Sequence, residues 1–485
     1  MKLTLTEILA IVSQTALPIA GEAPATYLTQ AVIDSRLAGP GSLFVALPGE
    51  KADGHTYVGH AFNRGAQAAL VAQPVDAPGI LLDARQPDTW PALLPSHEPV
   101  TILVDSPLHA LQTLASAWRA RFTPRVIGIT GSVGKTTTKE IVAAVLSQHY
   151  LTLKNRGNLN NEIGLPLTVL QLNEQHERLV VEMGMYDVGE IALLSHIAQP
   201  HIGVITNIGP VHLERLGTIE RIAQAKAELV EALPADGVAI LNADDPLVDA
   251  MAKQTTARVF RYGLTPGTDL WADEIVGEGL DGIRFRFHYQ NDVLHVRVPL
   301  LGRHSVHTAL RAAAVGLVDG LSWEEIIRGM QQLDVQLRLI AARTAHGAIL
   351  LDDTYNASPA STMAALNLLA DLTVENGRRI AVLGDMLELG SYEEEGHRKI
   401  GARAADVVDF LVTVGQRGRI IAEEAEAAGL AAARIVAFDT AAAALEDLRT
   451  IIGPGDVVLV KGSRAVHMDE IASALATSPA KQTEA

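Results

Sequence analysis

The stretch Arg125-Val126-Ile127-Gly128-Ile129-Thr130-Gly131-Ser132-Val133-Gly134-Lys135-Thr136-Thr137-Thr138 joins an apolar run to a glycine-rich turn and the start of a helical pattern. A strand that leads through such a turn into a helix is the setting of a phosphate-binding loop. Glycines allow backbone N–H groups to face an anion, and the helix N-terminus favours negative charge. The residues predicted to hold a nucleotide here are Gly131, Ser132, Gly134, Lys135, Thr136 and Thr137.

Within this loop, Lys135 is expected on the β- and γ-phosphates and the Thr136 hydroxyl on magnesium. The common form of the motif has a further glycine at position 129, where this chain has Ile129, so the loop relies on Gly131 and Gly134. The alternative is a glycine-rich turn that binds nothing. The Lys-Thr pair directly after the glycines favours the phosphate loop.

Further short apolar runs, separated by helical patterns, predict a mostly parallel sheet around this loop and a second, doubly wound sheet towards the C-terminus. The expected strands of the first sheet are 125–130, 179–182, 202–206 and 238–242, and those of the second are 349–352, 380–383, 410–414, 435–438 and 457–460. The fold class is therefore α/β. We expect three domains, at residues 1–107, 108–334 and 335–485, with the first a small α/β domain containing β-rich stretches at 32–36 and 42–47.

Composition restricts the function. The chain has 485 residues, a formal net charge of −17 and no cysteine. Its length suggests several domains, and the acidic balance argues against nucleic acid as a partner. Disulfides and thiolate chemistry are excluded. Thr4 and Glu7 form a capping-box pattern before a short amphipathic helix, which argues against a signal peptide, and no apolar stretch is long enough to cross a membrane. We expect a cytoplasmic protein.

Polar residues follow two of the predicted strands at the edge where the phosphate loop lies. Glu182 ends one strand, and Asn207 and His212 follow the next. Because the carboxyl ends of parallel strands face one crevice, Glu182 and His212 are candidate magnesium ligands. A helix cap and an ordinary loop histidine are the alternatives. Lys226 lies in a predicted helix and by itself has the character of a solvated surface lysine.

Several longer stretches resemble the Mur ligases of peptidoglycan synthesis, and the resemblance covers essentially the whole chain. They are Asn155-Arg156-Gly157-Asn158-Leu159-Asn160-Asn161-Glu162-Ile163-Gly164-Leu165-Pro166, Glu182-Met183-Gly184-Met185, Asn207-Ile208-Gly209-Pro210-Val211-His212-Leu213-Glu214, Asp352-Asp353-Thr354-Tyr355-Asn356-Ala357-Ser358-Pro359 and Leu383-Gly384-Asp385-Met386-Leu387-Glu388-Leu389-Gly390.

The resemblance implies an ATP-dependent carboxylate–amine ligase that joins D-alanyl-D-alanine to a UDP-linked muramoyl tripeptide through an acyl phosphate. It implies a first domain for the UDP end of the substrate, a central domain with P-loop for ATP and a Rossmann-like third domain for the amine. It also implies two magnesium ions, with Thr136, Glu182, His212 and Lys226 as ligands and Lys226 carbamylated by carbon dioxide. Lys135, His212 and Lys226 are then the catalytic residues. A monomer is expected.

The same resemblance assigns binding residues outside the phosphate loop. Arg338 and Asp353 match nucleotide-contacting positions of the C-terminal domain. The residues matched to the two substrates are Asp34, Ser35, Arg36, Asn158, Asn161, Asn356 and Asp385. The stretch Lys461-Gly462-Ser463-Arg464 resembles the end of the family's last strand, with a solvated loop as the alternative.

One motif departs from the family pattern. Gly302-Arg303-His304-Ser305-Val306-His307-Thr308-Ala309 occupies the place of G-x-H-N-x-x-N-A, whose asparagines help to read adenine. Ser305 and Thr308 offer hydroxyls but not the paired donor and acceptor of an amide. Recognition of adenine is therefore the step at which this sequence departs from the mechanism that the resemblance implies.

Three alternatives stay open. A related ligase could add a diamino acid or glutamate, although the chain lacks a D-N-P-R stretch, and Asp-Thr-Tyr-Asn-Ala-Ser-Pro points to the dipeptide instead. A phosphate-loop kinase or regulatory NTPase would explain Lys135 and Thr136 but leave the outer domains unused. A binding protein descended from a ligase would fit the altered Ser305 and Thr308.

Overall fold

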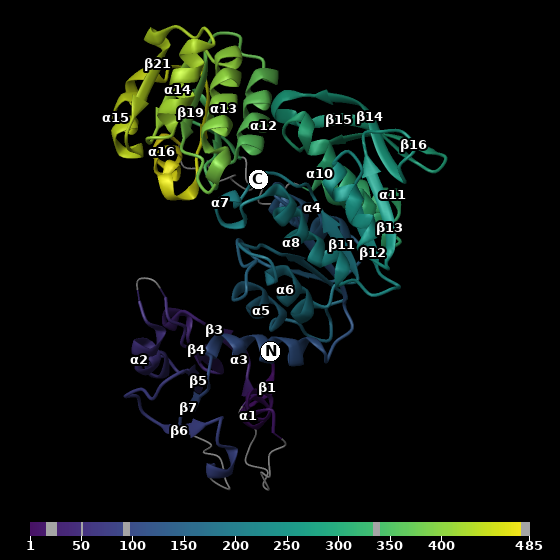
Figure 1. The fold of residues 1–485 in the computed structure, drawn as a ribbon, viewed down its shortest axis with the longest axis vertical. Coiled ribbons are helices and arrows are strands. Elements are labelled where there is room, and N and C mark those ends of the chain that lie inside the picture. Colours follow the sequence, from purple (N-terminus) through teal and green to yellow (C-terminus); the bar gives the residue numbers. More distant parts are fainter. Residues whose placement is uncertain (16–26, 50–51, 91–97, 333–339, 477–485) are drawn as a thin grey trace, which may run out of the picture. The chain divides into compact units, whose positions relative to one another are not determined.

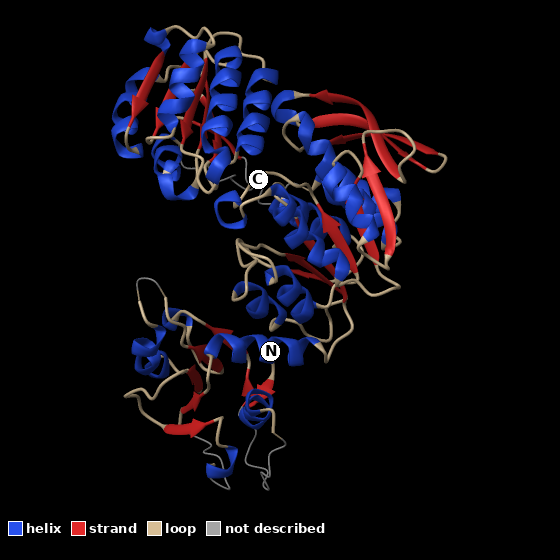
Figure 2. Ribbon diagram, viewed as in Figure 1, coloured by secondary structure: helices blue, strands red, loops and turns tan. Residues whose placement is uncertain are grey.

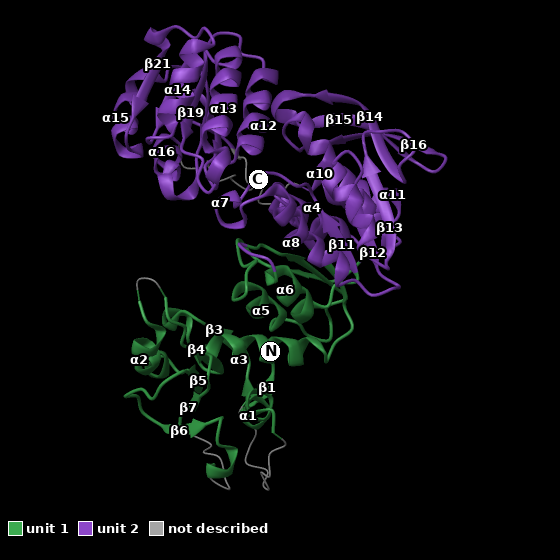
Figure 3. Ribbon diagram, viewed as in Figure 1, with its two compact units in different colours: residues 1–128, 150–185, 189–201 green, residues 129–149, 186–188, 202–485 purple. Residues whose placement is uncertain are grey.

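The computed structural model describes residues 1–15, 27–49, 52–90, 98–332 and 340–476 (Figure 1). It is a mixed α/β structure, as Figure 2 shows, and the α/β class predicted from the sequence is confirmed. The chain separates into two compact units (Figure 3). Unit 1 comprises residues 1–128, 150–185 and 189–201, and unit 2 comprises residues 129–149, 186–188 and 202–485.

The N-terminal part of unit 1 is built on a five-stranded sheet with parallel pairing and the order β3-β4-β5-β7-β6. Its strands are β3 (Gln30–Val32), β4 (Ser42–Val45), β5 (Ala68–Val71), β6 (Ile80–Asp83) and β7 (Val100–Leu103). Strands β4, β5 and β7 are buried throughout, and α2 (Val58–Asn63) adds Val58, Ala61 and Phe62 to the core.

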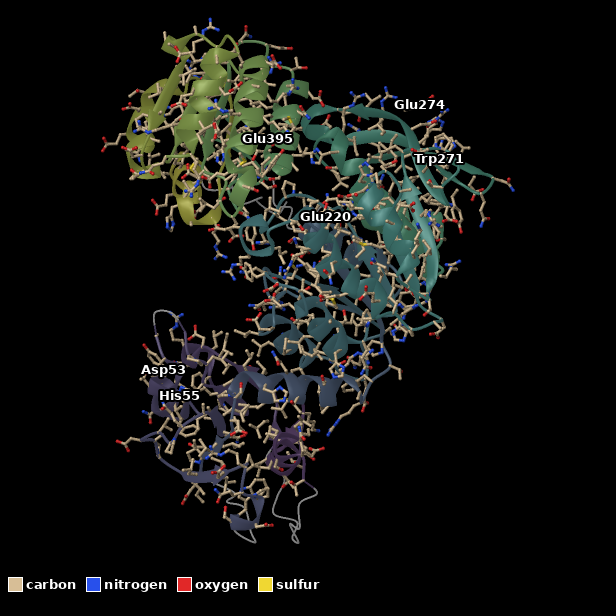
Figure 4. The ribbon with its side chains drawn as sticks, viewed as in Figure 1. Asp53, His55, Glu220, Trp271, Glu274 and Glu395 are labelled. Carbon is tan, nitrogen blue, oxygen red and sulfur yellow. The ribbon has the colours of Figure 1, made fainter. Side chains whose placement is uncertain are left out.

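Short capped turns complete this region. The capping box at Thr4 and Glu7 is present, and it starts α1 (Leu5–Ser13) beside the strand pair β1 (Leu3–Thr4) and β2 (Tyr27–Leu28). Asp53 and His55, labelled in Figure 4, hold a second turn: the His55 Nδ1 atom lies 2.6 Å from Asp53 Oδ1, and His55 Nε2 accepts the Ala72 N–H.

The β-rich stretch expected at 32–36 is wrong except at Val32. Strand β3 ends at Val32, and Ser35–Leu37 forms a 3₁₀ turn whose N-cap is Asp34. The Asp34 carboxylate accepts the backbone N–H of Arg36, which is the local bond by which aspartate competes with extended structure.

The remainder of unit 1 contains three helices and two strands, namely α3 (Pro107–Arg119), α5 (Gly164–Val169), α6 (Glu190–Ala198), β9 (Thr152–Lys154) and β10 (Arg178–Glu182). Two long side chains of α3 fix this region. Trp118 Nε1 donates to Leu172 O over 3.0 Å, and Arg119 Nε donates to Ala198 O over 2.9 Å. These bonds join segments 54 and 79 residues apart in the sequence.

A nine-stranded sheet has the order β16-β15-β14-β13-β12-β11-β8-β10-β9. Its remaining strands are β8 (Arg125–Thr130), β11 (Ile202–Ile205), β12 (Val238–Asn242), β13 (Arg258–Gly263), β14 (Leu270–Gly277), β15 (Ile283–Tyr289) and β16 (Asp292–Val298). The predicted strands β11 and β12 pair in parallel. Strands β13 and β14, which the sequence analysis did not predict, continue the parallel pairing, and β14, β15 and β16 then pair antiparallel.

The helices of this part of unit 2 are α4 (Lys135–Leu146), α7 (Leu213–Leu216), α8 (Ile219–Glu231), α9 (Pro246–Asp249), α10 (Val306–Val318) and α11 (Trp323–Gln331). Helices α10 and α11 both pack on α4, and Figure 1 shows α10 beside α4. Gly329 of α11 makes the close approach possible, because a Cβ there would lie 2.4 Å from the Val145 Cα.

The C-terminal part of unit 2 holds a six-stranded sheet with the order β17-β18-β22-β19-β20-β21. The strands are β17 (Ile340–Arg343), β18 (Ile349–Asp353), β19 (Arg379–Gly384), β20 (Phe410–Val414), β21 (Ile435–Phe438) and β22 (Val457–Lys461). All pairs are parallel except β17 with β18.

Two separate cores lie on the two faces of this sheet, which confirms the doubly wound arrangement. One face packs on α12 (Pro359–Asp371), α13 (Glu393–Val407) and α14 (Gly418–Ala427), and the other on α15 (Ala441–Ile451) and α16 (Met468–Leu475). In the part of the chain that the structure describes, no helix is long and apolar enough to cross a membrane.

Candidate functional site

The phosphate loop connects β8 to α4. Strand β8 is buried from Val126 onward, and the helix begins at Lys135. Gly131 and Gly134 have φ values of 144° and 83°, which disfavour any residue with a side chain. At Gly131 a Cβ would also lie 1.8 Å from Thr206 Oγ1. Both glycines on which the sequence analysis relied are thus required by the shape of the loop.

The end of the neighbouring strand holds the loop in place. Asn207 accepts the Ser132 N–H with its backbone oxygen and the Val133 N–H with its side-chain oxygen, each over 2.9 Å. Thr206 Oγ1 donates to Val133 O over 2.7 Å. Ser132 Oγ accepts the Gly209 N–H and lies 3.1 Å from Gly209 O. The loop is therefore fixed before any ligand arrives, and Asn207 is a positioning residue that the sequence analysis left without a role.

Lys135 folds back over this loop. Its ammonium donates to Gly131 O over 2.8 Å and to Ser132 O over 3.3 Å. Thr136 and Thr137 follow in the first turn of α4 and are half-buried. The structure thus gathers the six predicted phosphate ligands on one loop and helix N-terminus, an arrangement that suits an anion.

Lys226 is buried. The prediction of a solvated surface lysine, made from the helical pattern without the family resemblance, is therefore wrong. Lys226 lies in α8 with 2% of its surface exposed. Burial, followed by the nearby charge of Lys135, lowers the pKa of the Lys226 ammonium well below its usual value. Burial thus favours the neutral amine at this position.

His212 begins α7 with a left-handed φ of 58°. Its Nδ1 atom lies 2.5 Å from Glu388 Oε2, and its ring meets the Tyr186 ring edge-on at 5.2 Å. The hydrogen bond from His212 lowers the pKa of Glu388. In this arrangement His212 is engaged with a carboxylate, and its predicted role as a magnesium ligand stays a prediction.

Glu182, in unit 1, is fully buried and held by asparagines of the 155–166 stretch. Asn160 Nδ2 donates to Glu182 Oε1 over 2.7 Å, and Asn155 Oδ1 accepts the Glu182 N–H over 2.9 Å. Of the asparagines predicted to bind substrate, Asn161 accepts the N–H of Gly164 at the start of α5, and the Asn158 carbonyl accepts the Asn160 N–H. Asn155 and Asn160 are positioning residues that the sequence analysis missed.

Asp34, Ser35 and Arg36 form one turn in the N-terminal part of unit 1. Arg36 makes two hydrogen bonds to the Asp34 carboxylate through Nε and one through Nη2, the last at 2.7 Å. These bonds lower the pKa of Asp34 to about 2. Ser35 Oγ lies 2.9 Å from His60 Nδ1. The Arg36 side chain is 82% exposed, so it is accessible to a ligand.

The strand ends of the C-terminal sheet hold a second polar group. Lys461 Nζ contacts Asp353 Oδ2 at 2.6 Å and donates to the backbone oxygen of Asn356 at 2.8 Å. Asp385, at the end of β19, accepts the Gly418 N–H at the start of α14. Arg338 lies outside the described residues. The structure therefore brings Asp353 and Asn356 together around Lys461.

The two residues that depart from the adenine motif are both buried. Ser305 Oγ donates to Leu301 O over 2.6 Å, and Thr308 Oγ1 accepts from Arg311 Nη2 over 2.8 Å. Arg311 was not singled out in the sequence, because its partners Thr138 and Tyr262 lie 173 and 49 residues away.

The next feature is the set of side chains that could bind a metal ion. Within the described ranges, no group of three or more His, Asp or Glu side chains is arranged to hold an ion. Mg²⁺ commonly takes one or two protein oxygens and completes its shell with water and nucleotide phosphates. The Thr136 hydroxyl in unit 2 and the Glu182 carboxylate in unit 1 are each an oxygen donor of the type that Mg²⁺ prefers.

Three family models match the chain, and together they cover most of it. The Mur ligase family catalytic domain matches residues 28–119, the Mur ligase middle domain residues 129–316, and the Mur ligase glutamate ligase domain residues 338–464.

Whole proteins are similar over nearly their full length. The UDP-N-acetylmuramoyl-tripeptide–D-alanyl-D-alanine ligase of Bacillus subtilis is 38% identical, covering 92% of this chain and 93% of the relative. The ligase of the same name from Mycobacterium tuberculosis is 40% identical, covering 91% of each. The crystal structure of MurF from Acinetobacter baumannii has a TM-score of 0.82 at 31% identity over 98% of this chain and 99% of that one. MurF ligase from Thermotoga maritima in complex with ADP has a TM-score of 0.76 at 28% identity, covering 92% and 96%.

Proposed function

The chain belongs to the Mur ligase family, and from that premise we propose that it uses ATP to join D-alanyl-D-alanine to a UDP-N-acetylmuramoyl tripeptide in peptidoglycan synthesis. Relatives that carry this activity in their names are similar across more than nine-tenths of the chain. Within the chain, the observation that supports the proposal is the phosphate loop. Its glycines and Lys135 have the arrangement of a binding site for a triphosphate.

The chemistry proceeds in two steps. The terminal carboxylate of the tripeptide attacks the γ-phosphorus of ATP, which forms an acyl phosphate and releases ADP. The amine of D-alanyl-D-alanine then attacks the acyl carbon, phosphate leaves, and the amine loses a proton. The Lys135 ammonium exchanges its contacts with Gly131 O and Ser132 O for phosphate oxygens, where it neutralises developing charge.

Lys226 supports the proposed carbamylation. An amine attacks carbon dioxide only as the free base, and the lowered pKa of Lys226 provides that form. The resulting carbamate would offer oxygens to a magnesium ion, which Thr136 and Glu182 would also hold. We propose two such ions, which would offset charge on the nucleotide. His212 would join them after leaving Glu388.

The remaining assignments follow from the family. We propose domains at residues 1–107, 108–334 and 335–485, with the UDP end of the substrate at Asp34, Ser35 and Arg36. Asn158 and Asn161 would hold the substrate's peptide end, Arg338 and Asp353 the nucleotide, and Asn356 and Asp385 the entering dipeptide. A cytoplasmic monomer is the expected form, since UDP-linked precursors and ATP are cytoplasmic compounds.

The test is an amine panel. Protein, ATP, Mg²⁺ and UDP-muramoyl tripeptide are incubated with D-alanyl-D-alanine, and phosphate release is measured against diaminopimelate, lysine and glutamate on the matching shorter substrates. We expect release only with the dipeptide, and none from K135A, which should keep its melting temperature. Release with a diamino acid but not with the dipeptide would reassign the substrate. Turnover of ATP without any amine would favour an NTPase.

A further inference from the structure

Arg311 is an arginine in the interior of unit 2. It lies in the second turn of α10, and only 4% of its surface is exposed. Its guanidinium donates to three hydroxyls: Nε to Thr138 Oγ1 over 2.9 Å, Nη1 to Tyr262 Oη over 3.3 Å and Nη2 to Thr308 Oγ1 over 2.8 Å. All three partners are neutral.

These partners belong to the support of the phosphate loop. Thr138 is in the first turn of α4, three residues after Lys135. Tyr262 Oη lies within 3.4 Å of the backbone oxygens of Ile205 and Thr206, and Thr206 in turn anchors Val133. The Nη2 atom of Arg311 lies 3.3 Å from the place where a Cβ on Gly134 would be. The guanidinium is thus held directly against the turn that receives the phosphates.

The charge of this guanidinium has no counter-ion among the residues that the structure describes. Among the described residues, no carboxylate lies within ion-pair distance of Arg311. The nearby Asp244 instead accepts the Leu264 N–H and the Thr265 hydroxyl. A buried cation without a counter-ion destabilises a protein even where its N–H groups are hydrogen-bonded. The pKa of His307 is lowered to about 4. Burial is the main cause, and the positive charge of Arg311 is the second.

We propose that Arg311 is a positioning residue of the nucleotide site, whose buried positive charge is matched by the phosphates of the bound nucleotide beside Gly134. It joins α10 to α4 through its bond to Thr138, so the turn that holds Lys135 keeps its shape. Thr308 stands where the family motif has an asparagine, and here its hydroxyl serves to orient Arg311. The proposal rests on the proposed function only in taking ATP as the nucleotide.

The experiment separates phosphate charge from adenine recognition. R311Q removes the charge and keeps amide donors, R311K keeps the charge, and R328M removes an exposed positive charge of α11 as the matched control. Binding of Mg²⁺-tripolyphosphate and of adenosine is measured by calorimetry, and KM and kcat for ATP are measured in the ligation assay.

We expect R311Q to bind tripolyphosphate at least about tenfold more weakly, with a matching rise in KM for ATP and a smaller change in kcat. R311K and R328M should stay within about threefold of wild type, and adenosine affinity should be unchanged in all variants. Tripolyphosphate affinity equal to wild type in folded R311Q overturns the proposal, as does a loss confined to adenosine.

If R311Q does not fold, T138V takes its place, since it removes only the hydroxyl that orients Nε. Weaker tripolyphosphate binding by T138V supports the proposal, and unchanged binding overturns it. Tripolyphosphate binding requires no amide formation. Failure of every amine in the ligation assay would therefore refute the proposed function while leaving this measurement valid.

Discussion

Lys226 and Lys461 are both 2% exposed, yet their surroundings differ completely. Lys461, at the end of β22, contacts the Asp353 carboxylate at 2.6 Å and two backbone oxygens. Lys226, in α8, has no hydrogen bond or ion pair with any described residue, and the charge that contributes to its lowered pKa is that of Lys135. Lys139, also fully buried, lies 3.0 Å from the Glu140 carboxylate.

The difference indicates what each lysine does. A buried ammonium that is paired and hydrogen-bonded stays charged and stabilises the native arrangement around it. A buried amine without a partner loses its proton, because the charged form is too poorly solvated. Lys461 and Lys139 are thus each paired with a carboxylate, whereas burial lowers the pKa of Lys226 near the phosphate loop and so favours the free amine that reacts with carbon dioxide.

The largest expected effect follows from replacing Lys226. K226M should reduce ligation by about 10³-fold, because the carbamate oxygens proposed to hold a metal ion would be lost. Its free energy of unfolding at pH 7 should be equal to or above that of wild type, because methionine does not have to give up a proton on folding. Phosphate release and urea denaturation measure the two quantities.

A carbon-13 signal gives an independent check on Lys226. Wild type incubated with ¹³C-bicarbonate should show one carbamate resonance that is absent from K226M. Because the folded pKa of Lys226 is lowered, the free amine is present in the native state at pH values below the usual range of lysine. K226M that retains activity, or an unchanged carbamate resonance in it, would contradict the role assigned to this residue.

The second effect concerns the paired lysine. K461M leaves the Asp353 carboxylate, which is only 15% exposed, without its partner. We expect the free energy of unfolding to fall by about 2–4 kcal/mol, somewhat below the usual figure for breaking a fully buried pair, since water still reaches Asp353. Urea denaturation of the full chain is the measurement.

The double variant K461M/D353L is the control for this pair. It removes both charges, so it should recover much of the stability that K461M loses. If K461M is as stable as wild type, the pairing of Lys461 with Asp353 does not stabilise the fold, and the contrast with Lys226 is contradicted. A K226M variant that is less stable than K461M would contradict it as well.

Part of this contrast could be read from the sequence. Ile222, Ala225, Lys226 and Leu229 follow the i, i+3, i+4, i+7 spacing of one helix face, so the pattern does place Lys226 with the apolar residues. The prediction of a solvated surface lysine gave more weight to the charge of the Lys226 side chain than to its position on the helix. The partners of Lys461 could not be read, because Asp353 and Asn356 lie 108 and 105 residues away and meet it only through the register of β18 with β22.

The phosphate loop was predictable because its determinants are local. The buried strand, two glycines and the helix start lie within fourteen consecutive residues. Every strand of the C-terminal sheet except β17 was found from its apolar run to within one or two residues. The antiparallel pair β15–β16 was missed, since its alternating, charged sequence is typical of a half-exposed hairpin rather than a core strand. Arg311 was missed for the same reason as Lys461: Thr138 lies 173 residues away.

The smallest effect is expected where a pair is exposed. Arg36 and Asp34 have good geometry, with Nη2 2.7 Å from Oδ2, but the arginine is 82% exposed. D34N keeps an oxygen that can cap the turn and loses the charge. The free energy of unfolding should therefore fall by only about 0.2–1 kcal/mol at pH 7.

The pH dependence of this pair has a definite sign. The folded pKa of Asp34, about 2, lies below the unfolded value. Its contribution is therefore complete above about pH 4 and is lost as the pH falls towards 2. The stability difference between wild type and D34N should accordingly shrink between about pH 4 and about pH 2. D83N is the matched control, because Asp83 accepts from the backbone and side chain of Arg85 in the same way. Both variants should lose similar stability, whereas only D34N, which frees Arg36, should change KM for the UDP-linked substrate. Equal KM values in D34N and D83N would remove Arg36 from the substrate site and leave the pair a surface contact.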